Sequence, residues 1–360
     1  MEEMSLSPSQ ESPIMLIEGN GGSYYVWNTT IFPFLGAAKV AAAVLVLNPG
    51  GFALPHYADC NKIGYVIQGT EGIAGLIDAA TSKEKVVKLK KGDAIAVPVG
   101  GVSWWSNAGD DEVKIVFLGE SVNDLGQFTY CILTGPMGIL KAFPTTTIGK
   151  AFDMNQEQAD VLVDSQKEPL IIKLEDPKTM QNLSKRADTK ALCYNFDEKP
   201  THINVKNGGS YTSLTKEKYP FLEGIELSGN YLRLEPNAMF GPVYYARDSG
   251  VQITYVVKGG GWVQVVSLTG KIVLDIPLKA GQVFGVPKLY LVSIGAGDEG
   301  IECFSIIKTS KPILGEVAGE KSVWKSLSPA VLQASLNISP EFYKTLVEKL
   351  DKSRIIRPAH

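Results

Sequence analysis

A histidine and a lysine in strand-like sequence are the residues best suited to chemistry in this chain. The sequence contains three histidines, His56, His202 and His360, and His56 stands six residues before Lys62. An imidazole that shares an apolar interior with an ammonium is pushed toward its neutral form, and burial also lowers the pKa of the lysine. Such a pair can transfer a proton as general base and acid. His56 and Lys62 are therefore the candidate catalytic residues.

The elements that must position these residues are short β-strands. Runs rich in β-branched residues, separated by Gly, Pro, Asp and Asn, occupy 40–47, 63–67, 72–77, 86–89, 94–97 and 113–118. Many short strands without long helical patterns between them predict an all-β fold, with an antiparallel sandwich or barrel in each half of the chain. Helical periodicity is expected only after each set of strands, over 153–164, 328–335 and 339–350.

Side-chain alternation along these strands defines a candidate site. Residues of equal parity lie on one face of a strand, so one set is expected to face the interior of the first barrel together. This set is His56, Ala58, Lys62, Ser103, Trp105 and Asn107. We predict that Ala58, Ser103, Trp105 and Asn107, with Tyr65 nearby, bind a small-molecule substrate between aromatic walls.

The chain is duplicated. The sequence Asn-Gly-Gly-Ser-Tyr at 20–24 returns at 207–211, and glycines, prolines and strand-like runs follow each copy in the same order. A chain of 360 residues is expected to form about two domains. We predict a flexible N-terminus over 1–14, a first barrel with a trailing helix over 15–165, a linker over 166–200, a second barrel with trailing helices over 201–350 and a C-terminal tail over 351–360.

Composition excludes several classes of partner. Lys and Arg number 35 against 38 Asp and Glu, so no positive excess is present to attract nucleic acid or anionic lipid. No apolar run approaches the ~18 residues of a membrane span. The four cysteines, Cys60, Cys131, Cys193 and Cys303, form no C-x-x-C pair and are expected to be free thiols. Because the N-terminal residues also lack the features of a secretory signal, we expect a cytoplasmic protein.

The spacing of His56 within its glycine and proline framework resembles the two motifs of the cupin family. The first motif has a glycine, two histidines, a glutamate and a second glycine. At these positions the chain has Gly50, His56, Ala58, Lys62 and Gly69. The second motif has a glycine, a proline, a second glycine, a histidine and an asparagine. At these positions the chain has Gly92, Pro98, Gly100, Ser103 and Asn107. The resemblance implies two tandem jelly-roll barrels, each followed by a short helical segment.

The metal-ligand positions of the motifs have been replaced. A cupin metal site uses three imidazoles and one carboxylate, because borderline divalent metals prefer such nitrogen and oxygen donors. His56 alone falls on one of these positions, and Lys62 places an ammonium where the carboxylate should be. We therefore predict that both barrels lack a metal and that the protein uses no cofactor.

The second half offers weaker candidates. Its motif positions are Val243, Tyr245, Gln252 and Gly259, followed by Gly281, Pro287, Leu289 and Val292. Tyr245 and Gln252 are candidate binding residues, with Arg247 and Asp248 near an entrance. Val243 and Val292 predict an apolar centre and a packed, structural domain.

Two barrels with trailing helices resemble the legumin-type and vicilin-type seed globulins of plants, and the sequence at 322–332 is similar to the legumin C-terminal stretch. The chain is more similar to cytosolic, glutelin-like bicupins, since it shows neither a signal peptide nor a Gln- and Glu-rich variable region. The resemblance implies a homo-oligomer, since legumin-like proteins form trimers. The helices of this chain could equally build a dimer or close a monomeric pseudo-dimer, and we expect a dimer or trimer.

Three functions remain open. In the first, which we adopt as the working hypothesis, a metal-independent bicupin of specialised metabolism binds a small metabolite and converts it through His56 and Lys62. The conversion would be a proton transfer, isomerisation, cyclisation or elimination. In the second, the protein is a seed-storage-like nutrient reservoir or a structural cupin, in which Lys62 extends its ammonium to the barrel mouth and His56 bonds a backbone carbonyl. The third is a sugar- or hormone-binding module.

Overall fold

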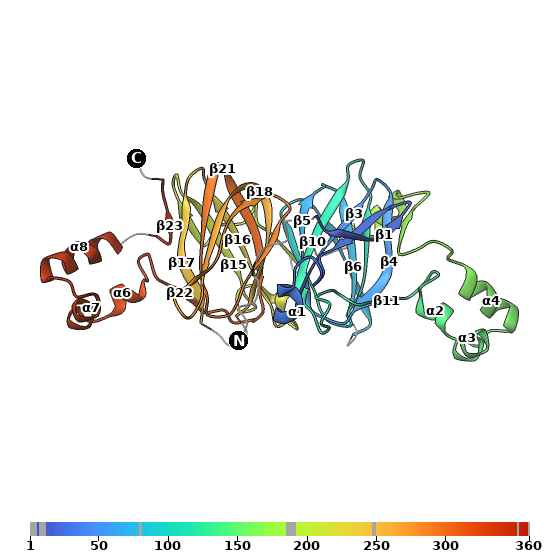
Figure 1. Cartoon of the computed structure of the whole chain (residues 1–360). Helices are drawn as coiled ribbons and strands as arrows, with labels where there is room; N and C mark the ends of the chain where they lie inside the picture. Colours follow the sequence, from blue (N-terminus) through green and yellow to red (C-terminus); the bar gives the residue numbers. More distant parts are fainter. Residues whose placement is uncertain are drawn as a thin grey trace. The chain divides into compact units, whose positions relative to one another are not determined.

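Antiparallel strands form most of the chain. The computed structural model describes Leu6 and residues 12–78, 81–184, 192–246, 250–350 and 353–358. It divides into two compact units (Figure 1). The first barrel comprises Pro13–Lys199 with Pro220–Ile225, and the second barrel mainly comprises Pro200–Tyr219 and Glu226–His360. The predicted all-β fold with two tandem jelly-roll barrels is confirmed.

Two antiparallel sheets enclose the core of the first barrel. One has the strand order β1-β2-β3-β10-β5-β8-β13, and the other has the order β11-β4-β9-β6-β7, with β12 added to β4. The strands are β1 Ile14–Gly19, β2 Gly22–Val26, β3 Val40–Leu47, β4 Gly51–Ala58, β5 Lys62–Gln68, β6 Gly72–Asp78, β7 Lys83–Leu89, β8 Asp93–Val97, β9 Val102–Asn107, β10 Val113–Glu120, β11 Tyr130–Ile132, β12 Ile171–Lys173 and β13 Cys193–Asn195.

Helix α1 lies between β2 and β3, and the other helices of the first unit come after β11. Helices α2, α3 and α4 project from the first barrel (Figure 1). The helix expected over 153–164 begins later, because Asp153 is the left-handed C-cap of α3 and Asn155 caps α4 through a capping box with Gln158. The helices are α1 Phe34–Ala38, α2 Ile139–Ala142, α3 Thr145–Phe152, α4 Gln156–Asp164 and α5 Lys178–Ser184.

The region expected to be a linker, 166–200, instead contributes strands to the first barrel. Its strand β12 pairs with β4, and Ile171 is fully buried in the core. Strand β13 pairs with β8 through Tyr194 and Ala94. The sequence signals were weak because each strand is three residues long. Residues 185–191 lie outside the described part of the chain.

The second barrel repeats this plan around two long strands, β18 and β21, which pair with each other along most of their length. The C-terminal tail expected over 351–360 adds strand β23 to β17. The strands are β14 Ile203–Val205, β15 Gly209–Leu214, β16 Ser228–Leu234, β17 Met239–Tyr245, β18 Gln252–Val266, β19 Ile272–Lys279, β20 Val283–Val286, β21 Leu291–Ile307, β22 Leu314–Glu316 and β23 Ile355–Ile356.

The predicted helix pair follows the strands of the second barrel. Helix α6 spans Val323–Ser326, α7 spans Pro329–Leu336 and α8 spans Pro340–Leu350. A proline at the first position suits a helix start, because the missing N–H would have no partner there. Ser339 accepts a hydrogen bond from the backbone of Phe342 as expected of a cap, whereas the side chain of Ser328 makes no cap hydrogen bond.

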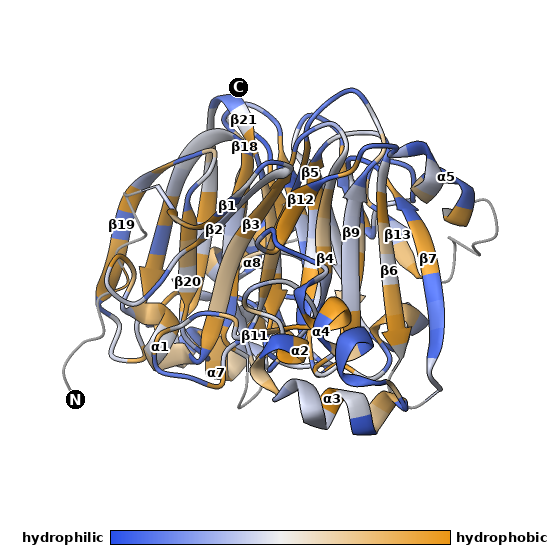
Figure 2. Ribbon diagram, turned by 90° about the vertical axis from the view of Figure 1, so that its right-hand side faces the viewer, coloured by the Kyte–Doolittle hydropathy of each residue, from blue (hydrophilic) through white to orange (hydrophobic). Residues whose placement is uncertain are grey.

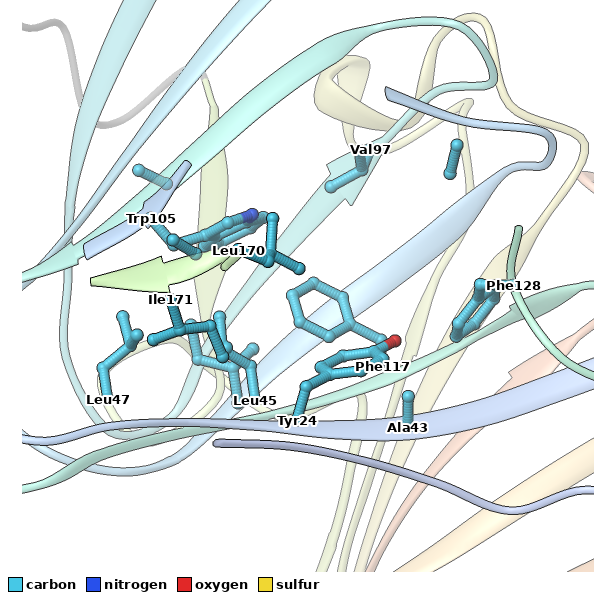
Figure 3. Packing of buried hydrophobic residues seen from close by; sticks show 14 of the residues in the cluster. Tyr24, Ala43, Leu45, Leu47, Val97, Trp105, Phe117, Phe128, Leu170 and Ile171 are labelled. Atoms are coloured by element: carbon cyan, nitrogen blue, oxygen red, sulfur yellow. The ribbon is translucent and has the colours of Figure 1, made fainter. Parts of the chain in front are cut away.

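Apolar side chains fill the space between the two sheets of the first barrel. Figure 3 shows Trp105, Phe117 and Leu170 among the residues of this core. Figure 2 shows hydrophobic residues along strands such as β6 and β12, with hydrophilic residues in many connecting loops. The candidate site therefore lies in an interior from which water is largely excluded.

Candidate functional site

Strands β4, β5 and β9 bring five of the predicted site residues to the interior of the first barrel. His56 pairs with Ser103 across β4 and β9, and the register shifts between Ala53 and His56. This bulge changes the alternation, so that Ala53 and His56 both point inward although their offset is odd. The five residues, all buried, are His56, Ala58, Lys62, Ser103 and Trp105.

Lys62 lies inside a group of aromatic rings. Its Nζ is 3.3 Å from the hydroxyl oxygen of Tyr130 and 4.3 Å from the centre of that ring. The ring centres of Phe117 and Phe128 lie 5.2 and 5.3 Å from the same nitrogen. Among the residues that the structure describes, no carboxylate forms an ion pair with Lys62. The rings thus stabilise an ammonium that has no counter-charge in contact with it.

Burial lowers the pKa of Lys62 from 10.5 to about 8, against the opposing influence of Cys60 and Asp59. The side chain is 1% exposed. The hypothesis that Lys62 extends its ammonium to the barrel mouth is therefore wrong, because the nitrogen stays between aromatic rings. Burial also raises the pKa of the Cys60 thiol, which favours its protonated form.

His56 is held as a neutral imidazole. Its Nδ1 lies 2.8 Å from the carbonyl oxygen of Leu54, which can only accept, so Nδ1 carries the proton and Nε2 carries the lone pair. The ring meets Tyr130 edge to face at 5.0 Å. Burial, reinforced by the charge of Lys62, lowers the pKa of His56 to about 3. The hydrogen bond to a backbone carbonyl that one hypothesis required is present.

The acid–base roles differ from those expected. A general base is most effective when its pKa lies near the ambient pH. His56, with a pKa of about 3, accepts a proton too weakly at neutral pH. Lys62, with a pKa of about 8, populates both its charged and its neutral forms. Lys62 is therefore the group of this site that can exchange a proton, and His56 is a hydrogen-bond acceptor.

Ser103 adds a polar group without a partner. Its hydroxyl is buried and forms no hydrogen bond with any described residue. No described residue bonds the Nε2 of His56 either. A buried polar group that lacks a hydrogen bond is costly, on the order of 1–3 kcal/mol. An ammonium, a hydroxyl and an imidazole nitrogen in this interior therefore all have unused bonding capacity.

The sequence patterns did not identify two tyrosines of the site, Tyr24 and Tyr130. The hydroxyls of Tyr24 and Tyr130 are hydrogen-bonded to each other, and their rings meet edge to face at 5.5 Å. Burial raises the pKa of both phenols, so both are neutral. Tyr24 could have been identified from the sequence, because it ends the first copy of the repeated Asn-Gly-Gly-Ser-Tyr sequence. Tyr130 lies outside both cupin motifs, so no sequence pattern pointed to it.

Two predicted binding residues belong elsewhere. Tyr65 stands three positions after Lys62 on β5, so it faces the opposite side of the sheet, where its ring packs against Phe196 at 5.9 Å. The amide of Asn107 donates to the backbone oxygens of Leu47 and Asp111, and its Oδ1 accepts from the backbone of Gly109. Asn107 therefore shapes a turn at the end of β9. Neither residue is therefore part of the candidate site.

The residues at the metal-ligand positions do not fit a metal. They supply one imidazole, one ammonium and one hydroxyl, from His56, Lys62 and Ser103, with Ala58 at the remaining position. Across the described residues, no group of three or more His, Cys, Asp or Glu side chains is placed to hold a metal ion. An ammonium beside the imidazole would also repel a cation.

The centre of the second barrel is less apolar than predicted. Val243 and Val292 are buried as expected. However, Gln252 donates to Thr254 and Ser305 at 3.0 and 3.1 Å. These three side chains form a buried polar network, and the prediction of an apolar centre is wrong in this respect. Gln252 stands at a motif position, but its partners Thr254 and Ser305 lie outside the motifs, so the motifs did not predict the network.

Tyr245 lines a cavity of about 640 Å³ in the second barrel. Its hydroxyl accepts from Asn230 and lies 3.5 Å from the hydroxyl of Tyr211, which lines the same cavity. Arg354 and Glu316 form an ion pair of 2.7 Å in its wall. Gln252 is not part of this wall. Arg247, Asp248 and His360 lie outside the described residues.

Comparison with known proteins decides the family. The family model described as "Cupin" matches residues 7–160 and matches again over 194–344. The chain belongs to the cupin family. Because the two matches cover the two halves of the duplicated sequence, this cupin is a bicupin.

The bicupin is similar in sequence to seed globulins. The bicupin is 25% identical to cocosin 1 of Cocos nucifera, over 84% of this chain and 77% of that protein. It is 22% identical to the 11S globulin seed storage protein 2 of Sesamum indicum, over 92% of this chain and 86% of that one. The bicupin is therefore legumin-like along most of its length.

Solved structures agree on the fold. The crystal structure of the coconut allergen cocosin matches with a TM-score of 0.87 and 24% identity, covering 99% of this chain and 100% of that one. The 11S globulin from Wrightia tinctoria matches with a TM-score of 0.86 and 20% identity, covering 99% and 97% of the two chains. In the described part of the bicupin, no helix has the length and apolar character needed to span a membrane.

Proposed function

We propose that this bicupin is a storage-type protein, a nutrient reservoir without a catalytic metal. The observation that carries this proposal is its likeness to seed storage globulins over 84% to 92% of its length. This reverses our working hypothesis, which put metabolite conversion first. A reservoir needs a stable, densely packed fold rather than a reactive site, and both barrels have buried cores.

The test is the abundance of the protein through seed development. Quantitative mass spectrometry of the source plant should show the protein rising during seed maturation and falling during germination, when reserves are consumed. A constant level in seeds, or a maximum in tissues that store no nitrogen, would contradict the proposal. Fractionation of the same tissue would test the cytoplasmic location expected from the sequence.

We also propose that the chain assembles as a homo-oligomer through its helices. Large apolar side chains on α3 and α8 are more than half exposed, with Phe152 at 53% and Phe342 at 56%. Exposed apolar faces of this kind are ordinarily covered by a partner. Multi-angle light scattering of the purified protein would distinguish a monomer, a dimer and a trimer.

A second candidate function is the binding of a small organic ligand in the first barrel. The observation that favours it is the unused bonding capacity of Lys62, Ser103 and His56 in one interior. A pure packing role does not require these polar groups. The structure of the 11S globulin from Wrightia tinctoria reveals an auxin binding site in that protein, which supports small-ligand binding on this fold.

Ligand binding is testable by native mass spectrometry of the purified protein mixed with plant metabolite extract. The wild type should retain a small molecule that the Lys62→Met variant does not retain. Equal retention by the two proteins would show that Lys62 does not contribute to binding and would contradict this candidate function. Turnover of the retained compound would restore the isomerase, cyclase or lyase hypothesis, with Lys62 as the proton-exchanging group.

A further inference from the structure

Lys62 differs from every other lysine that the structure describes. Among these described lysines it alone is buried, at 1% exposure. Its nitrogen contacts a tyrosine hydroxyl and three aromatic rings. Other lysines, such as Lys141 with Asp164, pair with carboxylates at the surface. An amine that is desolvated and not held by a carboxylate is the form of lysine that acts as a nucleophile.

We propose that Lys62 forms a reversible imine with the carbonyl carbon of a small aldehyde or ketone in the first barrel. This inference rests on the ligand-binding function proposed above for that barrel. The substrate class follows from the neighbours of the Lys62 nitrogen: the rings of Phe117, Phe128 and Tyr130 favour an apolar or aromatic body that carries one carbonyl group.

The step is balanced by the amine and the carbonyl compound alone. The lone pair of the neutral Lys62 nitrogen adds to the carbonyl carbon, and the carbonyl π electrons move to oxygen. That oxygen takes one proton from the nitrogen, and the product is a carbinolamine. Its C–O bond then breaks as the C=N bond forms, and the oxygen leaves as water with the second proton of the amine. No oxidant or reductant is consumed.

The neighbouring polar groups suit the intermediates of this step. The unpartnered Ser103 hydroxyl can donate to the carbonyl oxygen as it gains charge. The free Nε2 of His56 can accept a hydrogen bond from the carbinolamine hydroxyl. Ser103 and His56 face each other across β4 and β9. These two residues are positioning residues, whereas Lys62 alone forms the bond.

The charge state of Lys62 favours a role as an amine nucleophile over a role in binding an anion. With a pKa of about 8, about a tenth of Lys62 is neutral at pH 7, which is on the order of 100-fold more than for an ordinary lysine. The aromatic rings already stabilise the charged form, so a bound carboxylate is not required. A dry aromatic interior also slows hydrolysis of the imine, because water must enter for the reverse reaction.

Lys62 is the first residue of β5 and is buried. The connection between β10 and β11 passes this end and carries Phe128, which packs on the lysine nitrogen. The backbone of Thr129 is bonded to the side chain of Asp59. Because Lys62 is buried beneath this connection, labelling is expected to be slow, with one adduct at Lys62 for each chain.

The experiment traps the imine by reduction. The intact protein is incubated at neutral pH with benzaldehyde and sodium cyanoborohydride, with acetaldehyde as a smaller probe, and adducts are located by peptide mass mapping. We expect one dominant adduct at Lys62 that exceeds labelling of the exposed Lys141, and we expect its loss in Lys62→Met and in the charge-preserving Lys62→Arg. Labelling confined to surface lysines with both probes would overturn the proposal.

A parallel measurement separates this proposal from ligand binding. Native mass spectrometry without reductant compares benzaldehyde with benzyl alcohol, which has a similar size and no carbonyl, and with benzoate. Retention of benzyl alcohol or benzoate together with no adduct at Lys62 overturns the imine and leaves ligand binding intact. Retention of no compound, and no adduct, overturns both. An adduct at Lys62 that is absent from the Lys62→Met protein supports both.

Discussion

The Nζ of Lys62 lies 3.3 Å from the hydroxyl oxygen of Tyr130 and 4.3 Å from the centre of its ring. The ring of His56 is nearly perpendicular to the ring of the same tyrosine, with 5.0 Å between the ring centres. Tyr130 thus contacts both Lys62 and His56. Burial lowers the pKa of both groups, so each affects how the stability of the fold depends on pH.

Replacing Lys62 by methionine is expected to stabilise the protein at neutral pH. The folded pKa of about 8 lies below the ordinary value of 10.5, so burial of the charged form opposes folding at pH 7 by about 3 kcal/mol. Methionine has a similar shape and no charge. Denaturation by urea at neutral pH should give a higher free energy of unfolding for Lys62→Met than for the wild type.

The sign of the pH dependence provides the control for this variant. Between pH 8 and 10.5 the unfolded state binds more protons at Lys62 than the folded state does, so wild-type stability rises with pH across that window. The difference between wild type and Lys62→Met should therefore shrink as pH rises. A difference that stays constant would show that Lys62 keeps its ordinary pKa in the fold.

Much of the arrangement of the candidate site was predictable from the sequence. The contact between Tyr130 and Lys62 was not, because it depends on the pairing of strands that are far apart in the chain. Alternation along β4 and β9 placed His56 and Ser103 correctly. Alternation also argues against Tyr65, because an odd offset from Lys62 sends it to the other face of β5. Tyr130 reaches Lys62 because β11 pairs with β4, and a three-residue strand has no period from which that pairing can be read.

The second barrel shows the same limit. The motif positions Val243 and Val292 correctly predicted buried apolar side chains. The polar network of Gln252, Thr254 and Ser305 depends on β18 lying beside β21 in a particular register. Single-sequence patterns fix the inward face of a strand, but they do not fix which residues of two strands stand opposite each other.

Replacing His56 by glutamine is expected to reduce the sensitivity of the fold to acid. The neutral imidazole has a folded pKa of about 3, below the ordinary 6.5. The unfolded state therefore binds the proton first, and stability is lost as pH falls through this window, by up to about 5 kcal/mol. Urea denaturation between neutral pH and about pH 4 should show a flatter decline for His56→Gln than for the wild type.

The matched control is His202→Gln. His202 lies on an exposed position of the second barrel, and its pKa is lowered by partial burial and by Lys218. This variant should keep the acid sensitivity of the wild type more closely than His56→Gln does. If the two variants flatten the pH profile equally, the buried imidazole is not the main acid-sensitive group among the histidines.

Replacing Ser103 by alanine is expected to leave stability unchanged or to increase it, because its buried hydroxyl has no partner among the described residues. Removing an unsatisfied polar group relieves a cost of about 1–3 kcal/mol. The control is Ser305→Ala, whose hydroxyl bonds Thr254 and Gln252 and whose loss should destabilise by about 1 kcal/mol. Equal destabilisation in both variants, measured by urea denaturation, would mean that Ser103 is bonded in solution.

Charged substitutions on the helices are expected to disrupt assembly without unfolding either barrel. Phe152 on α3 and Phe342 on α8 are more than half exposed, so their replacement by glutamate changes little inside the chain but places a charge on each apolar face. Light scattering should show a lower molar mass for Phe152→Glu combined with Phe342→Glu. Leu268→Glu, at a site 68% exposed in the turn between β18 and β19, should keep the wild-type mass. If the double variant keeps that mass too, these two helical positions do not form the assembly interface.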